Sequence, residues 1–414
     1  MLYDFDKLID RRGTNAMKIE ELPAGCPEDS LSAWVADMDF PCAQPILDAL
    51  HERIDRQILG YTRYHAENGK QAVKNWFLRR FGWEIKAEEI CHCPGVVPAL
   101  AFLIEALTQP GDGIVIQKPV YYPFSAKIKG AGRTVVNSPL VRREREGGRF
   151  DYVMDLTDLD RKLSQAKNKG LIISSPHNPV GRVWTKEELR GVLELGKKHN
   201  KWIISDEIHC DLTRVGQAHT PLLKLVDEMA EEDDSWKEYR KQVAVCTAPS
   251  KTFNIAGLCF SNIIVPEGGI LREKWNETLG DRFHLDYVCN PLSQVGMIAA
   301  YNEGEEWLEQ IRAYLDGNIA YIEGFLKEHL PKAKMAHCQG TYLVWIDCSG
   351  YCDDAQKLEQ AMQQIGRVAL DEGYIFGSEG AGYERINIAM PRSMVEDCMV
   401  RMEKALTWLE NHNE

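Results

Sequence analysis

The chain has 414 residues, of which 44% are hydrophobic and 27% charged, a composition typical of a soluble globular protein with a large buried core. Its 62 acidic and 49 basic residues give a formal net charge of −13, which argues against a general nucleic-acid binder or a protein that docks on anionic lipid. No apolar run reaches the roughly 18 residues of a membrane span, and the N-terminus has no apolar signal segment. We therefore expect a cytoplasmic protein whose twelve cysteines are reduced.

The first predicted helix with a chemical signature covers residues 99–107 and follows the turn 94–98. Gly95 permits a tight turn, and Pro98 suits the first position of a helix. A helix N-terminus presents backbone N–H groups that have no partner within the helix. The segment is therefore a candidate phosphate cradle, although it matches neither of the common glycine-rich nucleotide motifs.

Short apolar runs alternate with helical patterns up to about residue 290. The runs are 114–117, 171–174, 202–206 and 243–246. A helix is expected over 185–198, where Thr185 and Glu188 form a capping-box pattern. Continuous apolar runs are typical of strands that are buried on both faces. The alternation predicts an α/β fold with a mostly parallel central sheet.

Polar side chains follow three of these runs. Asn178 lies in the proline- and glycine-rich turn after the second run, Asp206 ends the third, and Lys251 follows the fourth beside Ser250. Ligands of open α/β sheets bind beyond the carboxyl ends of the strands. We therefore expect these side chains to converge on one site, where the Asp206 carboxylate can face a bound cation.

Beyond about residue 290 the pattern changes to long helices and short strands. Helices are expected over 294–330 and 393–410, and strands over 341–346 and 385–389. This pattern predicts a smaller α+β domain.

We expect three parts in the chain. They are an N-terminal segment (1–45) that joins the small domain, a large α/β domain (46–290) and the small C-terminal α+β domain (291–414). The acidic stretch 227–238 is expected to be a solvated surface helix or loop.

One cluster of potential metal ligands, Cys91-His92-Cys93, lacks the spacing that lets ligands converge on one ion. Adjacent side chains of an extended segment point to opposite faces. We expect no metal site there.

Taken together, these segments resemble pyridoxal 5'-phosphate (PLP) enzymes of the aspartate-aminotransferase fold, fold type I. Within that fold the chain is most similar to the cystathionine β-lyase group of the MalY/PatB type. The motifs that carry the resemblance run in the family's order over nearly the whole chain: WVADMDF (34–40), GYTRY (60–64), PGVVPAL (94–100), PVYYPF (119–124), SSPHNPVGRVW (174–184), SDEIHCDL (205–212), APSKTFNIAGL (248–258) and RINIAMPR (385–392).

The resemblance implies a role for each candidate residue. Lys251 would bind PLP covalently and act as the base at the substrate Cα, and Asp206 would pair with the ring nitrogen. Asn178 would hydrogen-bond the phenolic oxygen and also lie near the substrate, and Tyr121 would stack on the ring. The phosphate would be held by the backbone around Gly95, Val96 and Val97, with Ser250.

The resemblance also implies a substrate site and a homodimer. Arg385 would bind the substrate carboxylate, with Ala36 nearby. Tyr61 would reach across a dimer interface to the neighbouring cofactor. His209 stands where aspartate-type transaminases carry a tyrosine, and Cys259 where many carry a phosphate-binding arginine. Both departures favour the lyase group, and His209 is counted among the cofactor-binding residues.

The leading hypothesis is a carbon–sulfur β-lyase that acts on L-cystathionine or L-cysteine. An aminotransferase of class I/II is the main alternative, because it would use the same residues. A non-catalytic binding protein on this scaffold is a remote alternative, since Lys251, Asp206, Asn178 and Arg385 are all present.

Overall fold

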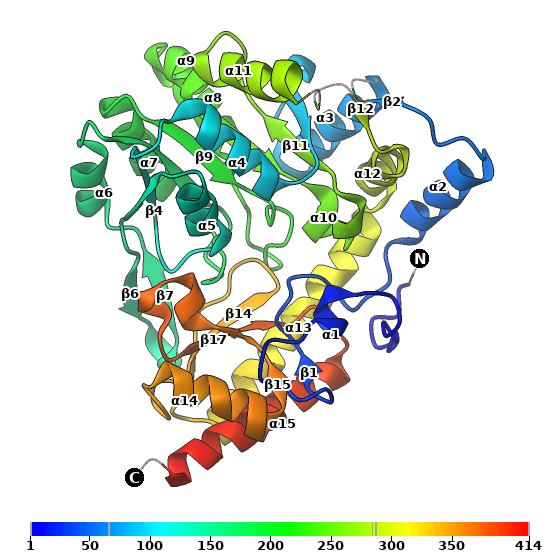
Figure 1. Ribbon diagram of the computed structural model, residues 1–414, viewed down its shortest axis with the longest axis vertical. Coiled ribbons are helices and arrows are strands. Elements are labelled where there is room, and N and C mark those ends of the chain that lie inside the picture. The colour runs from blue at the N-terminus through cyan, green and yellow to red at the C-terminus, as the bar shows by residue number, and fades with distance from the viewer. Residues whose placement is uncertain (1, 65–66, 284, 286–287, 413–414) are drawn as a thin grey trace.

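A seven-stranded sheet forms the centre of the larger part of the molecule (Figure 1). The structure is a computed structural model that describes residues 2–64, 67–283, 285 and 288–412. In spatial order the strands are β3 (Ile90–Cys93), β11 (Ser261–Ile264), β10 (Val243–Thr247), β9 (Trp202–Asp206), β8 (Asn168–Ser174), β4 (Gly113–Ile116) and β5 (Thr134–Asn137). β11 runs antiparallel to both neighbours, and every other pair is parallel. The expected α/β fold with a mostly parallel sheet is confirmed.

Alternate residues of the central strands point to opposite faces of this sheet. In β8, Leu171 and Ile173 pack into one apolar cluster, to which α6 (Leu156–Leu163), α7 (Lys186–Lys198) and α8 (Leu222–Glu232) contribute. Ile172 packs into a second cluster with α4 (Val96–Leu107), α5 (Pro123–Gly130) and α11 (Ile270–Trp275). Because helices cover both faces, the strands carry continuous apolar runs.

Helix α4 begins earlier than its sequence suggests. Gly95 is the N-cap residue, and the helix starts at Val96, so Pro98 is its third residue and not its first. Proline is tolerated there because the N–H groups of the first turn have no intrahelical acceptor. The backbone of Val96 and Val97 therefore lies within the first turn of the helix.

The capping box and the acidic stretch both behave as predicted. The backbone N–H of Glu188 donates to Thr185 Oγ1 at 3.2 Å, and that of Thr185 donates to Glu188 Oε2 at 2.8 Å. The acidic stretch covers the end of α8 and most of α9 (Ser235–Tyr239). Its carboxylates pair with basic side chains of α7, Glu228 with Lys186 and Glu232 with Arg190. Such exposed pairs contribute little stability individually.

A four-stranded antiparallel sheet lies in the C-terminal part of the chain. Its order is β13 (Lys334–Met335), β14 (Leu343–Asp347), β17 (Tyr383–Asn387) and β16 (Asp371–Glu372). The predicted helix over 294–330 is two helices, α12 (Pro291–Glu303) and α13 (Glu305–His329), which meet at Gly304. A Cβ at Gly304 would lie 2.5 Å from the Phe253 ring, so glycine permits this close packing.

The N-terminal segment contacts this C-terminal part, because β1 (Leu31–Ser32) pairs in parallel with β15 (Val368–Ala369). Helix α12 begins where the sequence suggests that the second domain starts, and it packs against α2 (Gln44–Asp55) and α3 (Glu67–Phe81) as well as α13. The other regular elements are α1 (Met17–Glu20), β2 (Thr62–Arg63), β6 (Val141–Glu144), β7 (Phe150–Val153), α10 (Pro249–Thr252), β12 (Val288–Cys289), α14 (Ala355–Gln360) and the C-terminal α15 (Arg392–His412).

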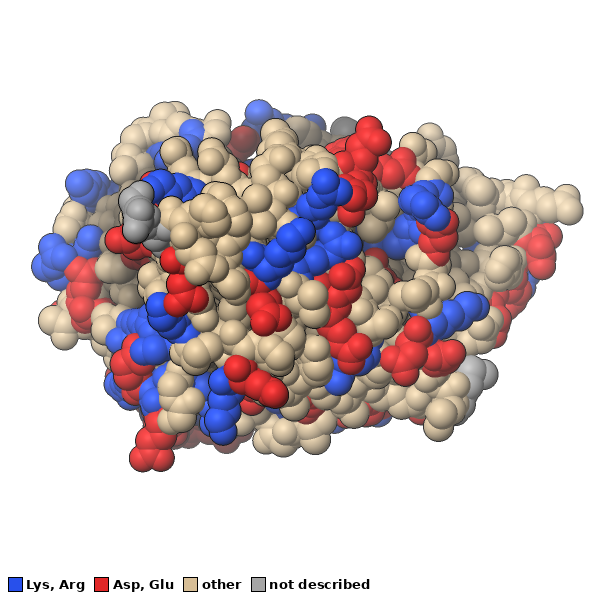
Figure 2. All heavy atoms as spheres, turned by 90° about the horizontal axis from the view of Figure 1, so that it is seen from below, with Lys and Arg blue, Asp and Glu red and all other residues tan. Residues whose placement is uncertain are grey.

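The surface is consistent with the charge balance of the sequence. On the face seen in Figure 2, acidic and basic side chains are interspersed, and neither sign forms a continuous patch. Among the described residues, no helix is both long and apolar enough to cross a membrane.

Candidate active site

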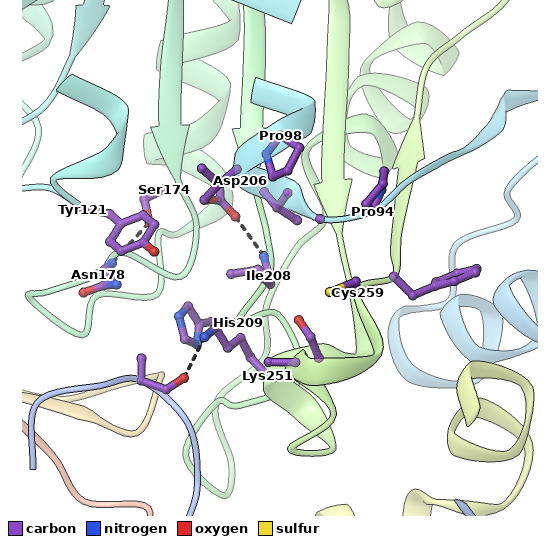
Figure 3. Close-up of a pocket in the computed structure, with 17 residues that line it drawn as sticks. Pro94, Pro98, Tyr121, Ser174, Asn178, Asp206, Ile208, His209, Lys251 and Cys259 are labelled. Atoms are coloured by element: carbon purple, nitrogen blue, oxygen red, sulfur yellow. Dashed lines mark hydrogen bonds between the residues drawn. The ribbon is translucent and has the colours of Figure 1, made fainter. Parts of the chain in front are cut away.

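A cavity lies at the carboxyl ends of β8, β9 and β10, beside the N-terminus of α4 (Figure 3). Parallel strands bring these ends to one edge of the sheet. The cavity is lined by Asn178, Asp206 and Lys251, the three residues that the sequence singles out after the strands. The structure therefore brings them together as expected.

Lys251 enters the cavity from the short helix α10, which follows β10 directly. Its Nζ donates a hydrogen bond to the carbonyl oxygen of Ala36 at 2.6 Å. Burial lowers the pKa of Lys251 to about 8; the charge of Arg385 also lowers it, whereas those of Asp37 and Asp206 oppose the shift. A substantial fraction of this amine is therefore neutral and nucleophilic in mildly alkaline solution.

Asp206 is the last residue of β9 and is almost fully buried. Its Oδ1 accepts the backbone N–H of Ile208 at 3.2 Å. Burial raises the pKa of Asp206 to about 7, with a further increase from Glu207, while Lys251 opposes the shift. A carboxyl group in this state ionises readily when a cation binds against it.

The turn after β8 positions Asn178 and Tyr121. The backbone N–H of Asn178 donates to Ser174 Oγ at 3.2 Å, and its carbonyl accepts the backbone N–H of Tyr121 at 3.0 Å. The Tyr121 ring lines the cavity beside Ser174. Burial raises the pKa of Tyr121 well above its usual value, so its hydroxyl stays protonated.

Arg385 lies behind Asn178 on β17, in the C-terminal sheet. It donates to Asn178 Oδ1 at 3.0 Å and to the Trp34 carbonyl at 3.1 Å, and it pairs with the carboxylate of Asp371. Its Nε is buried and has no partner within the described part of the chain. A guanidinium held in this way presents the fork that suits a carboxylate.

The other end of the cavity is formed by the N-terminus of α4 and the loop after α10. Gly95, Val96 and Val97 line it together with Ser250 and Cys259. No described side chain caps the first turn of α4. Uncapped N–H groups at a helix N-terminus favour an anion such as phosphate.

His209 and Ala36 also line the cavity. Burial lowers the pKa of His209 to about 3, with further contributions from Lys251 and Arg385, so its ring is neutral. Its ring lies edge-on to Tyr342, whose hydroxyl donates to the Ala36 carbonyl at 2.8 Å.

Two of the proposed site residues do not line this cavity. Arg385 lies directly behind Asn178, to which it donates a hydrogen bond, whereas Tyr61 lies away from the cavity. Its side chain is 99% exposed, so the single chain does not bring it to its own site.

Two residues of the site region, Asp371 and Tyr342, were not identified from the sequence. Asp371 lies on the two-residue strand β16, and no motif marks it; only the pairing of β16 with β17 places it opposite Arg385. A tyrosine within an apolar run, such as Tyr342, is expected to belong to the hydrophobic core, so the sequence gives no sign that it has a functional role.

The donor set of the cavity fits the cofactor that the sequence resemblance implies. The uncapped turn of α4 suits a phosphate, the Asp206 carboxylate suits a protonated ring nitrogen, and the Lys251 amine suits an aldehyde carbon. PLP carries all three groups. Among the described residues, no group of three potential ligands is arranged to hold a metal ion.

The chain matches known proteins over nearly its whole length. The sequence pattern of the family described as aminotransferase class I and II covers residues 35–401. Cystathionine beta-lyase PatB of Bacillus subtilis (strain 168) is 38% identical over 405 residues, which cover 98% of this chain and 100% of PatB. Protein MalY of Escherichia coli (strain K12) is 31% identical over 398 residues, covering 95% of this chain and 96% of MalY.

A solved structure agrees with these sequence relationships. Cystalysin from Treponema denticola, whose crystal structure contains a pyridoxal 5'-phosphate cofactor, is 34% identical and superposes with a TM-score of 0.90. The superposition covers 99% of this chain and 100% of cystalysin. By fold, by site geometry and by sequence, the chain belongs to the aminotransferase class I and II family.

Proposed function

We propose that the protein is a PLP-dependent carbon–sulfur β-lyase that acts on L-cystathionine, L-cysteine or a related thioether amino acid. The reaction breaks the Cα–H and Cβ–S bonds and, after hydrolysis, yields a thiol, pyruvate and ammonia. The observation that carries the proposal is the Lys251 amine in a buried cavity with Asp206, in a chain 38% identical to a cystathionine beta-lyase. The family is PLP-dependent, and the cavity holds the matching donor set.

When bound, PLP supplies an electron sink for the charge that develops at the substrate Cα. Asp206 would pair with the ring nitrogen and Tyr121 would cover the ring face. Asn178 would donate from Nδ2 to the phenolic oxygen of PLP, because its Oδ1 already accepts a hydrogen bond from Arg385. His209, kept neutral by burial, would pack in the same pocket without adding charge.

The phosphate end of the cavity has its own set of residues. The backbone N–H groups of Val96 and Val97, next to Gly95, would bind the phosphate together with the hydroxyl of Ser250. Cys259 lines the same end of the cavity.

Lys251 and Arg385 would act on different parts of the substrate. Arg385 would hold the α-carboxylate with Nε and a free Nη1 hydrogen, with Ala36 and Asn178 beside it. The neutral amine of Lys251 would take the proton from Cα, and the ammonium that results could protonate the departing thiolate. Burial of Lys251, which favours the neutral amine, supports this role.

The test is pyruvate release from L-cystathionine by purified, PLP-loaded protein without any added keto acid. Sustained release over many turnovers is expected of a β-lyase. One turnover at most, restored by a keto acid, would identify an aminotransferase, which uses the same lysine. A colourless protein that neither binds PLP nor releases pyruvate would leave only the binding-protein alternative.

We also propose that the protein is a homodimer in which Tyr61 reaches the site of the other subunit. The support is its 99% exposure beside the exposed apolar residues Ile58 and Leu59, since clustered apolar side chains on a surface are typical of an interface. The twelve cysteines, all free, suit a reducing compartment such as the cytoplasm.

A further inference from the structure

The N-terminal strap, defined here as residues 34–39, contacts both cationic groups of the site through its backbone. The carbonyl of Ala36 accepts hydrogen bonds from Lys251 Nζ at 2.6 Å and from the Tyr342 hydroxyl at 2.8 Å. The carbonyl of Trp34 accepts a hydrogen bond from Arg385 at 3.1 Å. The position of the strap therefore determines which backbone carbonyl oxygens lie beside Lys251 and Arg385.

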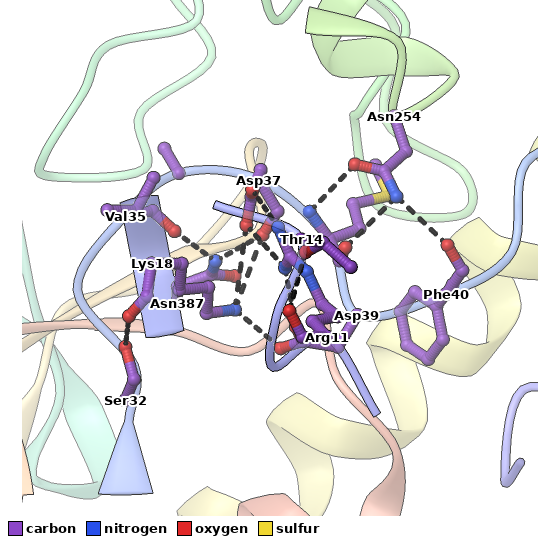
Figure 4. A network of polar contacts seen from close by, with 12 residues as sticks. Arg11, Thr14, Lys18, Ser32, Val35, Asp37, Asp39, Phe40, Asn254 and Asn387 are labelled. Carbon is purple, nitrogen blue, oxygen red and sulfur yellow. Dashed lines mark hydrogen bonds and ion pairs between the residues drawn. The ribbon is translucent and has the colours of Figure 1, made fainter. Parts of the chain in front are cut away.

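Two asparagines hold the backbone of the strap (Figure 4). Asn387, two residues after Arg385, donates from Nδ2 to the carbonyls of Val35 and Asp37, both at 2.6 Å. Asn254, three residues after Lys251, accepts the N–H of Met38 at 3.0 Å and donates to the Met38 carbonyl at 3.0 Å. The strap is thus tied to the same two segments that carry the site's cations.

Two further cations hold its carboxylates. Arg11 donates to both oxygens of Asp37, at 3.1 and 2.6 Å, and to Asp39 at 2.8 Å. The fully buried Lys18 pairs with Asp39 at 2.5 Å. Buried ion pairs of this kind contribute little net stability compared with apolar packing, but they select one geometry. Figure 4 shows Arg11, Lys18, Asp37 and Asp39 meeting on one side of the strap.

We propose that Arg11 is a positioning residue of the active site: its fork on Asp37, together with its contact to Asp39, holds the strap where the Ala36 carbonyl meets Lys251. The same fork offsets the charge of Asp37, which lies close enough to Lys251 to influence it. Both terminal nitrogens of Arg11 are bonded to Asp37 or Asp39, and Arg11 does not line the cavity that holds Lys251, so it acts through the strap and not on the substrate. The proposal deepens the proposed function and rests on it for the role of Lys251.

Removal of Arg11 has a defined electrostatic consequence. Titratable or charged groups face Lys251 from each neighbouring segment: Asp37 from the strap, Asp206 from β9, His209 from the following turn and Arg385 from β17. Of these groups, only Asp37 contacts Arg11, and when Arg11 is replaced it keeps only the longer ion pair with Lys18, at 3.9 Å. A less compensated carboxylate stabilises the ammonium form, and the pKa of Lys251 should rise.

The experiment uses Arg11→Met, with Arg12→Met as the matched control. Arg12 is the adjacent arginine and pairs with Asp10, but both of these side chains are largely exposed. Reductive methylation of Lys251 by formaldehyde and cyanoborohydride is followed by peptide mass spectrometry over a pH series in cofactor-free protein. In parallel, backbone hydrogen exchange of residues 33–40 is measured. Neither readout depends on turnover.

Arg11→Met is expected to move the methylation midpoint upward by about 0.5 to 1 pH unit and to speed hydrogen exchange in the strap at least about tenfold. Arg12→Met should change neither. The double variant Arg11→Met/Asp37→Asn should restore the midpoint but not the slow exchange. In PLP-loaded protein, kcat should fall more than KM rises, because Lys251 is the affected group.

An unchanged midpoint together with unchanged exchange in Arg11→Met would overturn the proposal. If Arg11→Met does not fold, Arg11→Lys replaces it: lysine keeps the charge but cannot fork two carboxylates, so exchange should quicken while the midpoint stays. A shift in midpoint without pyruvate production by the wild type would support the positioning role and reject the lyase function, so the two hypotheses fail separately.

Discussion

Asp371 and Arg385 face each other across β16 and β17 and form an ion pair in which the two side chains are 7% and 3% exposed. The carboxylate of Asp371, Asn178 Oδ1 and the Trp34 carbonyl together define the plane of the guanidinium. The arginine that would bind the substrate carboxylate is therefore oriented before any substrate arrives, which lowers the entropic cost of binding.

The first prediction concerns this orientation. Asp371→Ala should raise KM about tenfold, because the guanidinium loses one of its three fixed contacts, while kcat stays within about twofold. Asp371→Asn keeps an acceptor oxygen and should raise KM less than about threefold. Steady-state kinetics with L-cystathionine measures both, and equal effects of the two variants would show that the charge of Asp371 matters and its geometry does not.

The second prediction concerns Asp206, a buried carboxyl whose pKa is raised from 3.8 to about 7, mainly by burial. Because the folded-state pKa is raised, the carboxyl disfavours folding: the penalty is absent below about pH 4, grows between about pH 4 and 7, and is constant above that range. Asp206→Asn should therefore stabilise the cofactor-free protein by about 4 kcal/mol at pH 8 and by almost nothing at pH 4. It should also abolish turnover.

Denaturant unfolding of the cofactor-free variants at the two pH values measures this effect. Asp39→Asn is the control, because the Asp39 carboxylate is buried but pairs with Lys18 at 2.5 Å and with Arg11 at 2.8 Å. Its replacement should destabilise the protein. A loss of stability in Asp206→Asn at pH 8 would contradict the prediction.

The third prediction concerns the pH dependence of cofactor capture. Only the neutral amine of Lys251 attacks an aldehyde, and burial lowers its pKa to about 8. The rate at which cofactor-free protein binds PLP covalently should rise with pH and level off above a midpoint of about 8. Borohydride reduction followed by peptide mapping identifies the modified lysine.

Lys251→Ala is the matched variant for this experiment. It should show no covalent capture, and the turnover number should fall by at least about 10³-fold, while PLP still binds reversibly through the α4 N-terminus and Asp206. Capture at a different lysine with normal turnover would remove Lys251 from its role.

The fourth prediction concerns the proposed shared site. If Tyr61 serves the neighbouring subunit, a mixture of inactive Lys251→Ala and Tyr61→Ala chains should regain activity after subunit exchange. Half of the dimers would then be mixed, and each would hold one intact site, so about a quarter of wild-type activity is expected. Tyr61→Phe alone should weaken PLP binding with the fold intact.

Analytical ultracentrifugation checks the dimer itself. A monomer at assay concentration, or a mixture that stays inactive despite verified exchange, would exclude a shared site. Ile58→Ser is a useful companion variant, because it should weaken association without touching the cavity.

Much of the sheet and of the cavity could be predicted from the sequence because both depend on local patterns. A continuous apolar run such as 171–174 must be buried on both faces, and its successors in a parallel sheet end at the same edge. Asn178, Asp206 and Lys251 follow directly from this rule. The start of α4 was predicted too late, because Gly95 caps the helix and Val96 begins it, whereas Pro98 suggested a start near its own position.

Only the tertiary structure decided which segments that are far apart in the chain contact one another. Lys251 meets the Ala36 carbonyl across 215 residues of sequence, and Asp371 faces Arg385 only because a two-residue strand pairs with β17. The Arg11 fork on Asp37 is likewise invisible in the sequence, where both are ordinary charged residues. Local patterns report which backbone each residue prefers, whereas these partnerships depend on how whole segments pack, and no local pattern encodes that packing.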